Sequence, residues 1–253
     1  MSAPVLRVTD LKKSYGAIQA VAGVSFEVMP GEIFGVIGPN GSGKTTMFNS
    51  VLGQITPDAG SIELNGQNIT GLSPLALSRR GVGRTFQTLQ VFGKMSVRDN
   101  LVVAAQEHQG SMAGRMFAGS GFTDGDSGLG AKADNMLAQF RLTPVAHKKA
   151  GQLSYGQQKL IDIAMAFMSE PALVLLDEPC AGVNPTLVGG ISKLLKELNQ
   201  TRAGSFVVIE HNMDFVMGLC HRIMVMVEGK VMAIGTPAEI RANKQVLDAY
   251  LGS

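Results

Sequence analysis

Apolar residues in the first third of the chain follow the patterns of short β-strands. Residues 5–8 and 24–28 alternate apolar and polar positions, which predicts strands with one buried face. Residues 33–37 are almost continuously apolar, as a strand buried on both faces of a parallel sheet requires. Residues 61–64 predict a strand that an Asn-Gly turn closes as in a hairpin, and residues 82–86 predict a short further strand.

The middle of the chain changes to helical spacing. Residues 97–106 and 131–140 predict helices. Between them, residues 109–130 are rich in glycine, which predicts a loop, and we assign this loop no chemistry. We expect a mainly helical segment, from about residue 88 to residue 167, within a single domain that spans residues 1–253.

The last third alternates between strands and helices. Apolar runs predict strands at residues 173–176, 206–209, 222–227 and 230–233, and helical spacing predicts helices at residues 187–202 and 212–219. The last two strands are joined by Glu-Gly and predict a hairpin. The whole pattern predicts an α/β fold with a mainly parallel core sheet, an antiparallel β flank and an inserted α-helical subdomain.

Composition narrows the class of protein. The chain has 253 residues, of which 45% are hydrophobic and 17% charged, so it can bury a core. Its net charge of +2 gives no field that would hold nucleic acid, and its two cysteines are too few for a disulfide or zinc framework. It has no apolar run of about 20 residues and no apolar stretch at its start. We therefore expect a soluble cytoplasmic protein with no nucleic-acid partner.

The predicted strand at residues 33–37 runs directly into a glycine-rich loop and then a helix-like stretch. Loop and helix start fit the phosphate-loop pattern G-x-x-x-x-G-K-[ST] with the residues Gly38, Pro39, Asn40, Gly41, Ser42, Gly43, Lys44, Thr45 and Thr46. In such a loop, backbone N–H groups and the positive end of the helix bind phosphate oxygens. We expect a P-loop NTPase-type sheet in which Lys44 reaches the terminal phosphates and the Thr45 hydroxyl binds Mg²⁺.

A second apolar strand, residues 173–176, ends in Asp177 and Glu178. Ligands of open α/β sheets bind at the carboxyl ends of strands, so we expect this strand beside the phosphate loop. Asp177 would then be the carboxylate partner of Mg²⁺, and Glu178 would orient or deprotonate the attacking water. Adjacent acids also occur in ordinary solvated turns, and only the upstream loop favours the catalytic interpretation.

The segment at residues 153–158, Leu-Ser-Tyr-Gly-Gln-Gln, combines a helix start with a possible anion site. Ser154 followed by Gln157 predicts a capping box that opens a helix through Met168. The serine hydroxyl, the glycine N–H and the helix N-terminus also repeat the ingredients of a phosphate site. Because one loop already surrounds the phosphates, we expect this second site to serve the nucleotide of another copy, which predicts a dimer.

This segment, placed between the phosphate loop and Leu-Leu-Asp-Glu-Pro, resembles the signature of ATP-binding cassette (ABC) ATPases, whose usual form is Leu-Ser-Gly-Gly-Gln. Tyr155 departs from that form at the third position and leaves Ser154, Gly156 and Gln157 in place. The resemblance implies ATP as the nucleotide, Mg²⁺ as the accompanying ion and ATP hydrolysis as the activity. It also implies paired ATPase subunits in which the signature acts in trans.

Further motifs resemble those of the family in the same order along the chain. Tyr15 resembles the aromatic residue that stacks on adenine, Gln87 the Q-loop glutamine that contacts Mg²⁺ and water, and His211 the switch histidine that contacts the γ-phosphate. Asn184 lies in a D-loop-like segment where many relatives carry Asp, so a hydrogen-bonding side chain is kept and a charge is lost. The resemblance covers about residues 5–251.

A narrower similarity is to the ATPase subunits of branched-chain amino acid importers and their hydrophobic-amino-acid or urea-uptake relatives. It rests on the segments Arg-Thr-Phe-Gln, Glu-Pro-Cys-Ala-Gly-Val-Asn-Pro, Val-Ile-Glu-His-Asn-Met-Asp and Gly-Thr-Pro-Ala-Glu-Ile. It implies transmembrane permease subunits, a second ATPase subunit (the same chain or a sister chain) and, indirectly, an extracytoplasmic solute-binding protein. The implied location is the cytoplasmic face of the inner membrane, and the solute follows from the resemblance alone.

Two other classes of protein are alternatives. A soluble ABC ATPase of an assembly system, of the iron–sulfur type, would carry the same motifs without a permease. A regulatory nucleotide-binding module conflicts with the intact pair Asp177-Glu178 and with His211. We expect instead that two subunits close head to tail on two ATP molecules and open after hydrolysis.

Overall fold

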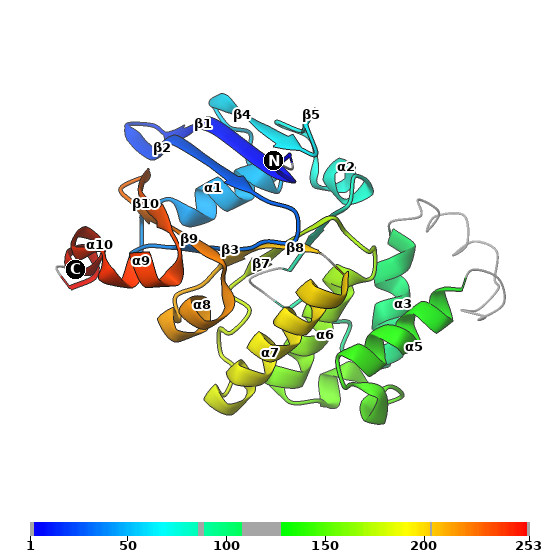
Figure 1. The fold of residues 1–253 in the computed structure, drawn as a ribbon. Coiled ribbons are helices and arrows are strands. Elements are labelled where there is room, and N and C mark those ends of the chain that lie inside the picture. Colours follow the sequence, from blue (N-terminus) through cyan, green and yellow to red (C-terminus); the bar gives the residue numbers. More distant parts are fainter. Residues whose placement is uncertain (1–2, 86–88, 108–127, 203, 252–253) are drawn as a thin grey trace.

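The computed structural model describes residues 3–85, 89–107, 128–202 and 204–251, and the strands of these residues form two sheets, one above the other (Figure 1). The first half contains β1 (Leu6–Tyr15), β2 (Ile18–Val28), β3 (Ile33–Ile37), α1 (Lys44–Val51), β4 (Ala59–Leu64), β5 (Gln67–Asn68), α2 (Pro74–Arg79), β6 (Val82–Arg84) and α3 (Val97–Glu107). The second half contains α5 (Leu129–Gln139), the 3₁₀ turns η1 (Thr143–Val145) and η2 (Ala150–Gln152), α6 (Tyr155–Phe167), β7 (Leu173–Asp177), α7 (Pro185–Arg202), β8 (Ser205–Ile209), α8 (Met213–Leu219), β9 (Arg222–Val227), β10 (Lys230–Gly235), α9 (Pro237–Ala242) and α10 (Lys244–Leu251). The predicted α/β class is confirmed.

The larger sheet has the strand order β10-β9-β3-β8-β7-β6, and its pairs are parallel except for β10 with β9. Alternate residues of its central strands enter different cores. In β3, Ile33 and Ile37 face one core, and Phe34 and Val36 face the other. Burial on both faces explains the unbroken apolar runs in the sequence. β8 lies between β3 and β7, so β7 is one strand away from the strand that leads into the phosphate loop.

The smaller sheet has the order β2-β1-β4-β5 and is antiparallel throughout, which confirms the predicted antiparallel flank. β1 and β2 are longer than the predicted strands because their pairing continues through several register shifts, the first between Val8 and Leu11. Such irregularities break the alternation of period two that the prediction used. The predicted turn joins β4 to β5, and Asn65 adopts a φ of +50° there.

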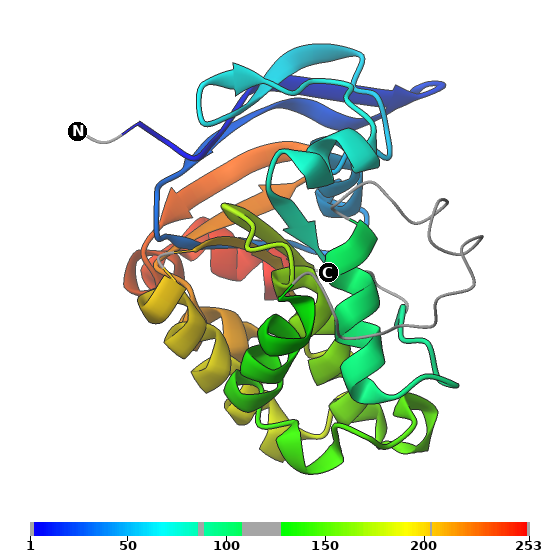
Figure 2. The ribbon, with the colours of Figure 1, turned by 90° about the vertical axis from the view of Figure 1, so that its right-hand side faces the viewer.

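Two hydrophobic cores cover the two faces of the larger sheet. One core lies between the sheets and contains the buried face of α1, with Met47 and Phe48 (Figure 2). The other lies between the larger sheet and the helices, where the ring of Phe167 contacts Phe140 and Phe206. The parallel strands β3, β8 and β7 end at the same edge of the sheet, so the loops that follow them emerge side by side.

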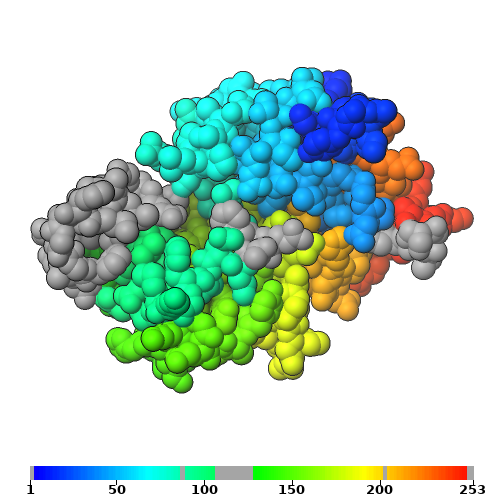
Figure 3. All heavy atoms as spheres, turned by 180° about the vertical axis from the view of Figure 1, so that it is seen from behind, coloured from blue at the N-terminus to red at the C-terminus, as the bar shows by residue number. Residues whose placement is uncertain are grey.

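The described part of residues 88–167 is mainly helical, as predicted, and its atoms occupy the lower part of the molecule seen from behind (Figure 3). α3 packs against α5 and α6. Gly128, with a φ of +66°, is the N-cap of α5, so the predicted loop through residue 130 extends two residues too far. Residues 109–127 of that loop lie outside the described residues. The boundaries of a helical subdomain stay a prediction.

Three short helices, α2, α9 and α10, were not predicted. α2 follows Ser73, whose hydroxyl accepts a hydrogen bond from the Ala76 N–H, and α9 follows a capping box between Thr236 and Glu239. α2 and α9 have six residues each, too few for a clear helical period, although their caps are recognisable. Among the described residues, no helix is both long enough and apolar enough to cross a lipid bilayer.

Candidate functional site

The phosphate loop lies between β3 and α1 and is held against two other segments of the chain. A Cβ atom on Gly43 would collide with the carbonyl oxygen of Ala20 in β2, and one on Gly38 would collide with the carbonyl oxygen of Met226 in β9. The N–H of Gly229, in the turn between β9 and β10, also donates to the carbonyl of Ser42 at 3.1 Å. Neighbouring backbone therefore fixes the shape of the loop, and glycine is required at these close approaches.

Lys44 lies across this loop, and its side chain is directed towards backbone oxygens. Its Nζ donates to the carbonyl of Gly38 at 2.8 Å and to that of Pro39 at 2.9 Å, and the residue is only 5% exposed. Burial lowers the pKa of Lys44, and the nearby charge of Glu178 opposes this shift. β3 and β7 end at the same edge of the sheet, so the phosphate loop and Glu178 follow strands that end at that edge.

Asp177 is the last residue of β7, at the edge of the sheet where the phosphate loop begins. Its N–H donates to the Thr85 hydroxyl at 3.1 Å, which links it to the residue after β6. Burial, and then the charge of Glu178, raises the pKa of Asp177; the charges of Lys159 and His211 oppose the shift. Two carboxylates close together in a partly buried position favour a bound cation.

Glu178 follows in a left-handed backbone conformation, with a φ of +46°. Its N–H donates to the carbonyl of Ile209 at 2.9 Å, and its own carbonyl accepts from the N–H of Ala181. Its Oε1 lies 3.1 Å from Nε2 of His211, which follows β8. The structure therefore brings together Glu178 and His211, which lie 33 positions apart in the sequence (211 minus 178), because β8 is the strand next to β7.

The signature segment starts α6 as predicted. Ser154 accepts a hydrogen bond from the Gln157 N–H, and the Gln157 side chain accepts from the Ser154 N–H, which confirms the capping box. A Cβ atom on Gly156 would collide with Leu187 of α7, so α6 and α7 approach closely at this point. Tyr155 is 46% exposed, and its ring lies against Gly182. The hydroxyl of Ser154 is exposed on this surface and bonds within its own helix end.

Three further predicted residues have different outcomes. Asn184 caps α7: its Oδ1 accepts from the Thr186 N–H at 2.9 Å, a role that Asn fills as well as Asp. Tyr15 is 49% exposed at the turn between β1 and β2, with the Lys13 ammonium 5.9 Å from its ring centroid. Gln87 lies outside the described residues.

Sequence reasoning did not assign roles to three buried charged residues near the site. Glu210 lies between β8 and His211, and its side chain accepts hydrogen bonds from both loops of the site. Lys159 and Asp162 lie in α6, where both are buried. Within the described residues, Lys159 Nζ and Asp162 Oδ2 have no hydrogen-bond partner. An acid directly after the apolar run of residues 206–209 was the available signal for Glu210, and polar positions on the buried face of α6 were the signal for the other two.

The residues present fit a nucleoside triphosphate with a divalent cation. The loop supplies backbone N–H groups and an ammonium, and Thr45 is exposed in the first turn of α1. No group of three metal-binding His, Cys, Asp or Glu side chains occurs in the part of the chain that the structure describes. A cation here would therefore bind Asp177 and the Thr45 hydroxyl and complete its coordination with phosphate oxygens, as Mg²⁺ commonly does.

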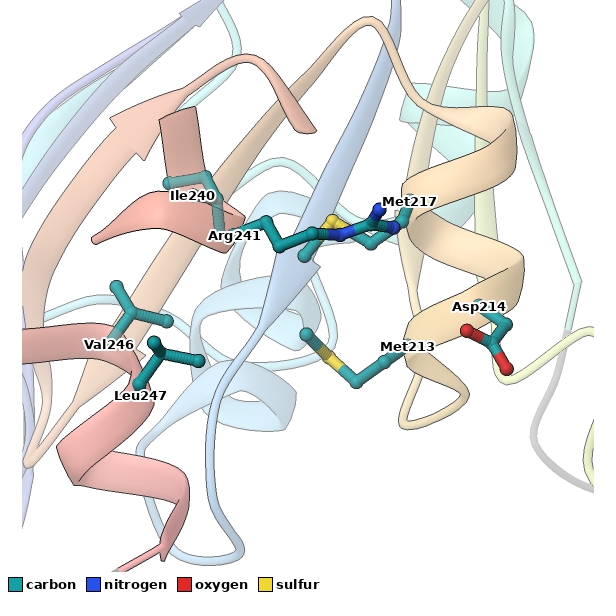
Figure 4. Close-up of a pocket in the computed structure, with 7 residues that line it drawn as sticks. All are labelled: Met213, Asp214, Met217, Ile240, Arg241, Val246 and Leu247. Atoms are coloured by element: carbon teal, nitrogen blue, oxygen red, sulfur yellow. The ribbon is translucent and has the colours of Figure 1, made fainter. Parts of the chain in front are cut away.

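An apolar pocket elsewhere contains none of the predicted site residues (Figure 4). It lies between α8 and the C-terminal helices α9 and α10, and it is lined by Met213, Asp214, Met217, Ile240, Arg241, Val246 and Leu247. The C-terminal helices thus pack near the helix that follows His211. This contact does not form part of the phosphate site.

Comparison with known protein families identifies the family of the chain. Residues 21–181, well over half of the chain, match the family model of the ABC transporter. The chain belongs to the ABC transporter family. A second model, of a branched-chain amino acid ATP-binding cassette transporter, matches residues 230–253 of this ABC transporter chain. The family confirms that the chain binds ATP and is an ATPase, as the sequence motifs predicted.

Relatives match this ABC transporter chain over its full length. It is 38% identical over 254 residues to the high-affinity branched-chain amino acid transport ATP-binding protein BraF of Pseudomonas aeruginosa, covering 100% of this chain and 99% of BraF. It is 39% identical over 256 residues to LivG of Escherichia coli K12, a protein of the same description, with the same coverage. A solved ABC transporter ATP-binding cassette in its ADP conformation superposes with a TM-score of 0.88 at 32% identity and covers 100% of both chains.

Proposed function

We propose that this chain is the ATP-hydrolysing subunit of an importer for branched-chain or other hydrophobic amino acids. The observation that carries the hydrolytic role is the contact between Glu178 and His211 at the sheet edge that also holds the phosphate loop. The solute class is supported by the model that matches residues 230–253 and by the names of the full-length relatives. Those relatives disfavour the iron–sulfur assembly alternative.

ATP would bind along the phosphate loop, with its adenine against Tyr15. Lys44 would exchange its bonds to two carbonyl groups for stronger, charge-assisted bonds to phosphate oxygens. Asp177, Thr45 and Gln87 would hold Mg²⁺. When bound, that ion neutralises charge on the phosphates.

Hydrolysis would depend on Glu178 and His211. Glu178 is partly exposed and would accept a proton from the attacking water. His211 would hold the Glu178 carboxylate and the reacting phosphate in position through its imidazole, and Gln87 would orient the same water. Because Glu178 directly follows Asp177, the same turn would position both the carboxylate that binds Mg²⁺ and the carboxylate that activates water.

A second ATPase subunit, either the same chain or a sister chain, would complete each site. Ser154, Tyr155, Gly156 and Gln157 of one subunit would face the triphosphate bound by the other, and Asn184 would lie at the same interface. The exposed Ser154 hydroxyl at a helix N-terminus supports this role. Permease subunits would hold the pair at the cytoplasmic face of the inner membrane, and an extracytoplasmic protein would deliver the solute to them.

Co-purification followed by uptake measurements tests the proposal. The tagged chain is isolated from membranes of its own cells and its partners are identified; uptake of leucine, valine and a polar amino acid is then compared in cells carrying the wild-type chain or the Glu178→Gln variant. We expect permease subunits in the complex and selective loss of leucine and valine uptake in the variant. Recovery of the chain without a membrane subunit, together with unchanged uptake, would contradict the proposal.

A further inference from the structure

Glu210 is a buried carboxylate that joins the two loops of the catalytic edge. It is 4% exposed, and its Oε1 accepts a hydrogen bond from the Cys180 N–H at 2.7 Å. Its Oε2 accepts from the N–H groups of His211 and Asn212 at 2.9 and 3.1 Å. One oxygen therefore binds the loop that follows β7, and the other binds the loop that follows β8.

The side chain continues the pairing of the two strands beyond the end of the sheet. The parallel ladder of β7 and β8 ends where Asp177 pairs with Ile209, and Glu178 adds one more bond to the carbonyl of Ile209. Beyond that point, the segments that follow β7 and β8 are no longer paired by backbone hydrogen bonds in the pattern of a sheet. The next link between them is the bond from the Cys180 N–H to the Glu210 carboxylate.

Glu178 is consequently fixed on both sides. Ile209 holds its N–H, and Glu210 holds the backbone two residues further on, at Cys180. The same carboxylate fixes the backbone of His211, whose ring contacts Glu178 at 3.1 Å. Three backbone N–H groups donate to the two oxygens of this one buried side chain, so it ties both turns to the same point.

We propose that Glu210 is a positioning residue for ATP hydrolysis, whose two oxygens hold the Glu178 turn and the His211 turn at the separation that lets their side chains meet. The proposal rests on the roles given above to Glu178 and His211. Glu210 itself touches neither ATP nor water in this account. Its effect on the rate therefore runs through the two neighbouring turns.

Glu32 provides a matched control. It is also a buried carboxylate, 7% exposed, and it also accepts a backbone hydrogen bond, from the Met29 N–H at 2.7 Å. It lies just before β3, at the edge of the sheet opposite to the phosphate loop, where it pairs with Arg222. Glu32→Gln should lower thermal stability and leave the turnover of the folded protein unchanged.

The first test measures kcat and the Kd for ATP in the full chain with Mg²⁺. In Glu210→Gln, one carboxylate oxygen becomes an NH₂ donor that faces backbone N–H donors, so one of the two loops loses its link. We expect kcat to fall about tenfold or more while the Kd for ATP changes by less than about twofold. Glu210→Asp keeps both acceptor oxygens and should recover part of the lost rate. A kcat for Glu210→Gln equal to that of Glu32→Gln would overturn the proposal.

The second test asks whether Glu210 acts through His211. If it does, adding Glu210→Gln to His211→Ala should lower the remaining rate by less than about threefold, because the contact between Glu178 and His211 that Glu210 maintains is already absent. Effects that multiply in full would overturn the proposed coupling. The rate of His211→Ala alone is measured first. A wild-type rate in that variant would contradict the proposed function itself, whatever the Glu210 variants show.

Discussion

Glu178 has a left-handed backbone conformation, which glycine adopts readily and a glutamate does not. Its φ of +46° places it in the left-handed region, which costs a non-glycine residue on the order of 1 kcal/mol or more. Hydrogen bonds to Ile209 and from Ala181 hold it there. The conformation directs the carboxylate towards His211, so the strain is located at the residue that we assign to water activation.

Replacing Glu178 by Gln should nearly abolish hydrolysis without preventing ATP binding. The amide has the same shape but cannot accept the proton of the attacking water, so we expect a loss of about 100-fold or more in kcat.

Lys44→Ala should instead weaken ATP binding, because it removes the cation that faces the phosphates. Rates from phosphate release and affinities from calorimetry separate the two effects. A wild-type rate in Glu178→Gln would show that another group is the base.

Asp162 gives a prediction about pH. Burial raises its pKa to about 6, although the charge of Lys159 and a hydrogen bond from the Gln90 N–H oppose the shift. The folded state therefore binds a proton at Asp162 more tightly than the unfolded state does. This proton stabilises the folded state at low pH, and the stabilisation is lost as the pH rises through about 6. Between pH 5 and pH 7.5 the wild type should lose about 1 kcal/mol relative to Asp162→Asn. Urea unfolding at both pH values measures this difference; an equal gap at both would contradict the assignment.

At the scale of elements, the phosphate loop depends on β2 and β9 as much as on β3 and α1. Gly43 lies against the carbonyl of Ala20 in β2, and Gly38 lies against that of Met226 in β9. The phosphate loop is therefore in contact with backbone of both sheets, β2 in the smaller sheet and β9 in the larger one. A change at one of these contacts must move a strand or the loop itself.

Gly43→Ala and Gly41→Ala form a matched pair that tests the contact with β2. Both positions have a positive φ, +92° and +80°, but only at Gly43 would the new Cβ meet backbone. We expect Gly41→Ala to lower the free energy of unfolding by about 1 kcal/mol from conformation alone. Gly43→Ala should lower it further and weaken ATP binding more than about tenfold. Equal effects on binding in calorimetry would show that the packing against Ala20 is unimportant.

The same elements show what the sequence could and could not predict. The buried strands β3, β7 and β8 were predicted because both faces are apolar, and α6 because Ser154 and Gln157 form a capping box. The full lengths of β1 and β2 were missed because register shifts remove the alternation. The position of β8 between β3 and β7 depends on long-range pairing, which no local pattern encodes. For the same reason, the link from Glu210 to Cys180, 30 positions apart, could not be predicted.

At the scale of the whole molecule, the phosphate loop and the start of α6 are two separate segments, and we propose that each binds phosphate. The bonds of Lys44 stay within the phosphate loop, and those of Ser154 stay within the start of α6. The exposed Ser154 and Tyr155 offer a surface that a second subunit can use. Closure of two such chains around ATP would link hydrolysis to their separation, and so to movement of a permease.

The structure of the Glu178→Gln variant with ATP and Mg²⁺ tests this central claim most directly. The measured quantity is the distance from the Ser154 hydroxyl to the γ-phosphate bound by Lys44, together with the chain from which each residue comes. We predict hydrogen-bond distance, with Ser154 and Lys44 contributed by different subunits and Asp177 beside the magnesium ion. Ser154 and Lys44 of one chain around a single nucleotide, or Asp177 far from the ion, would contradict the account.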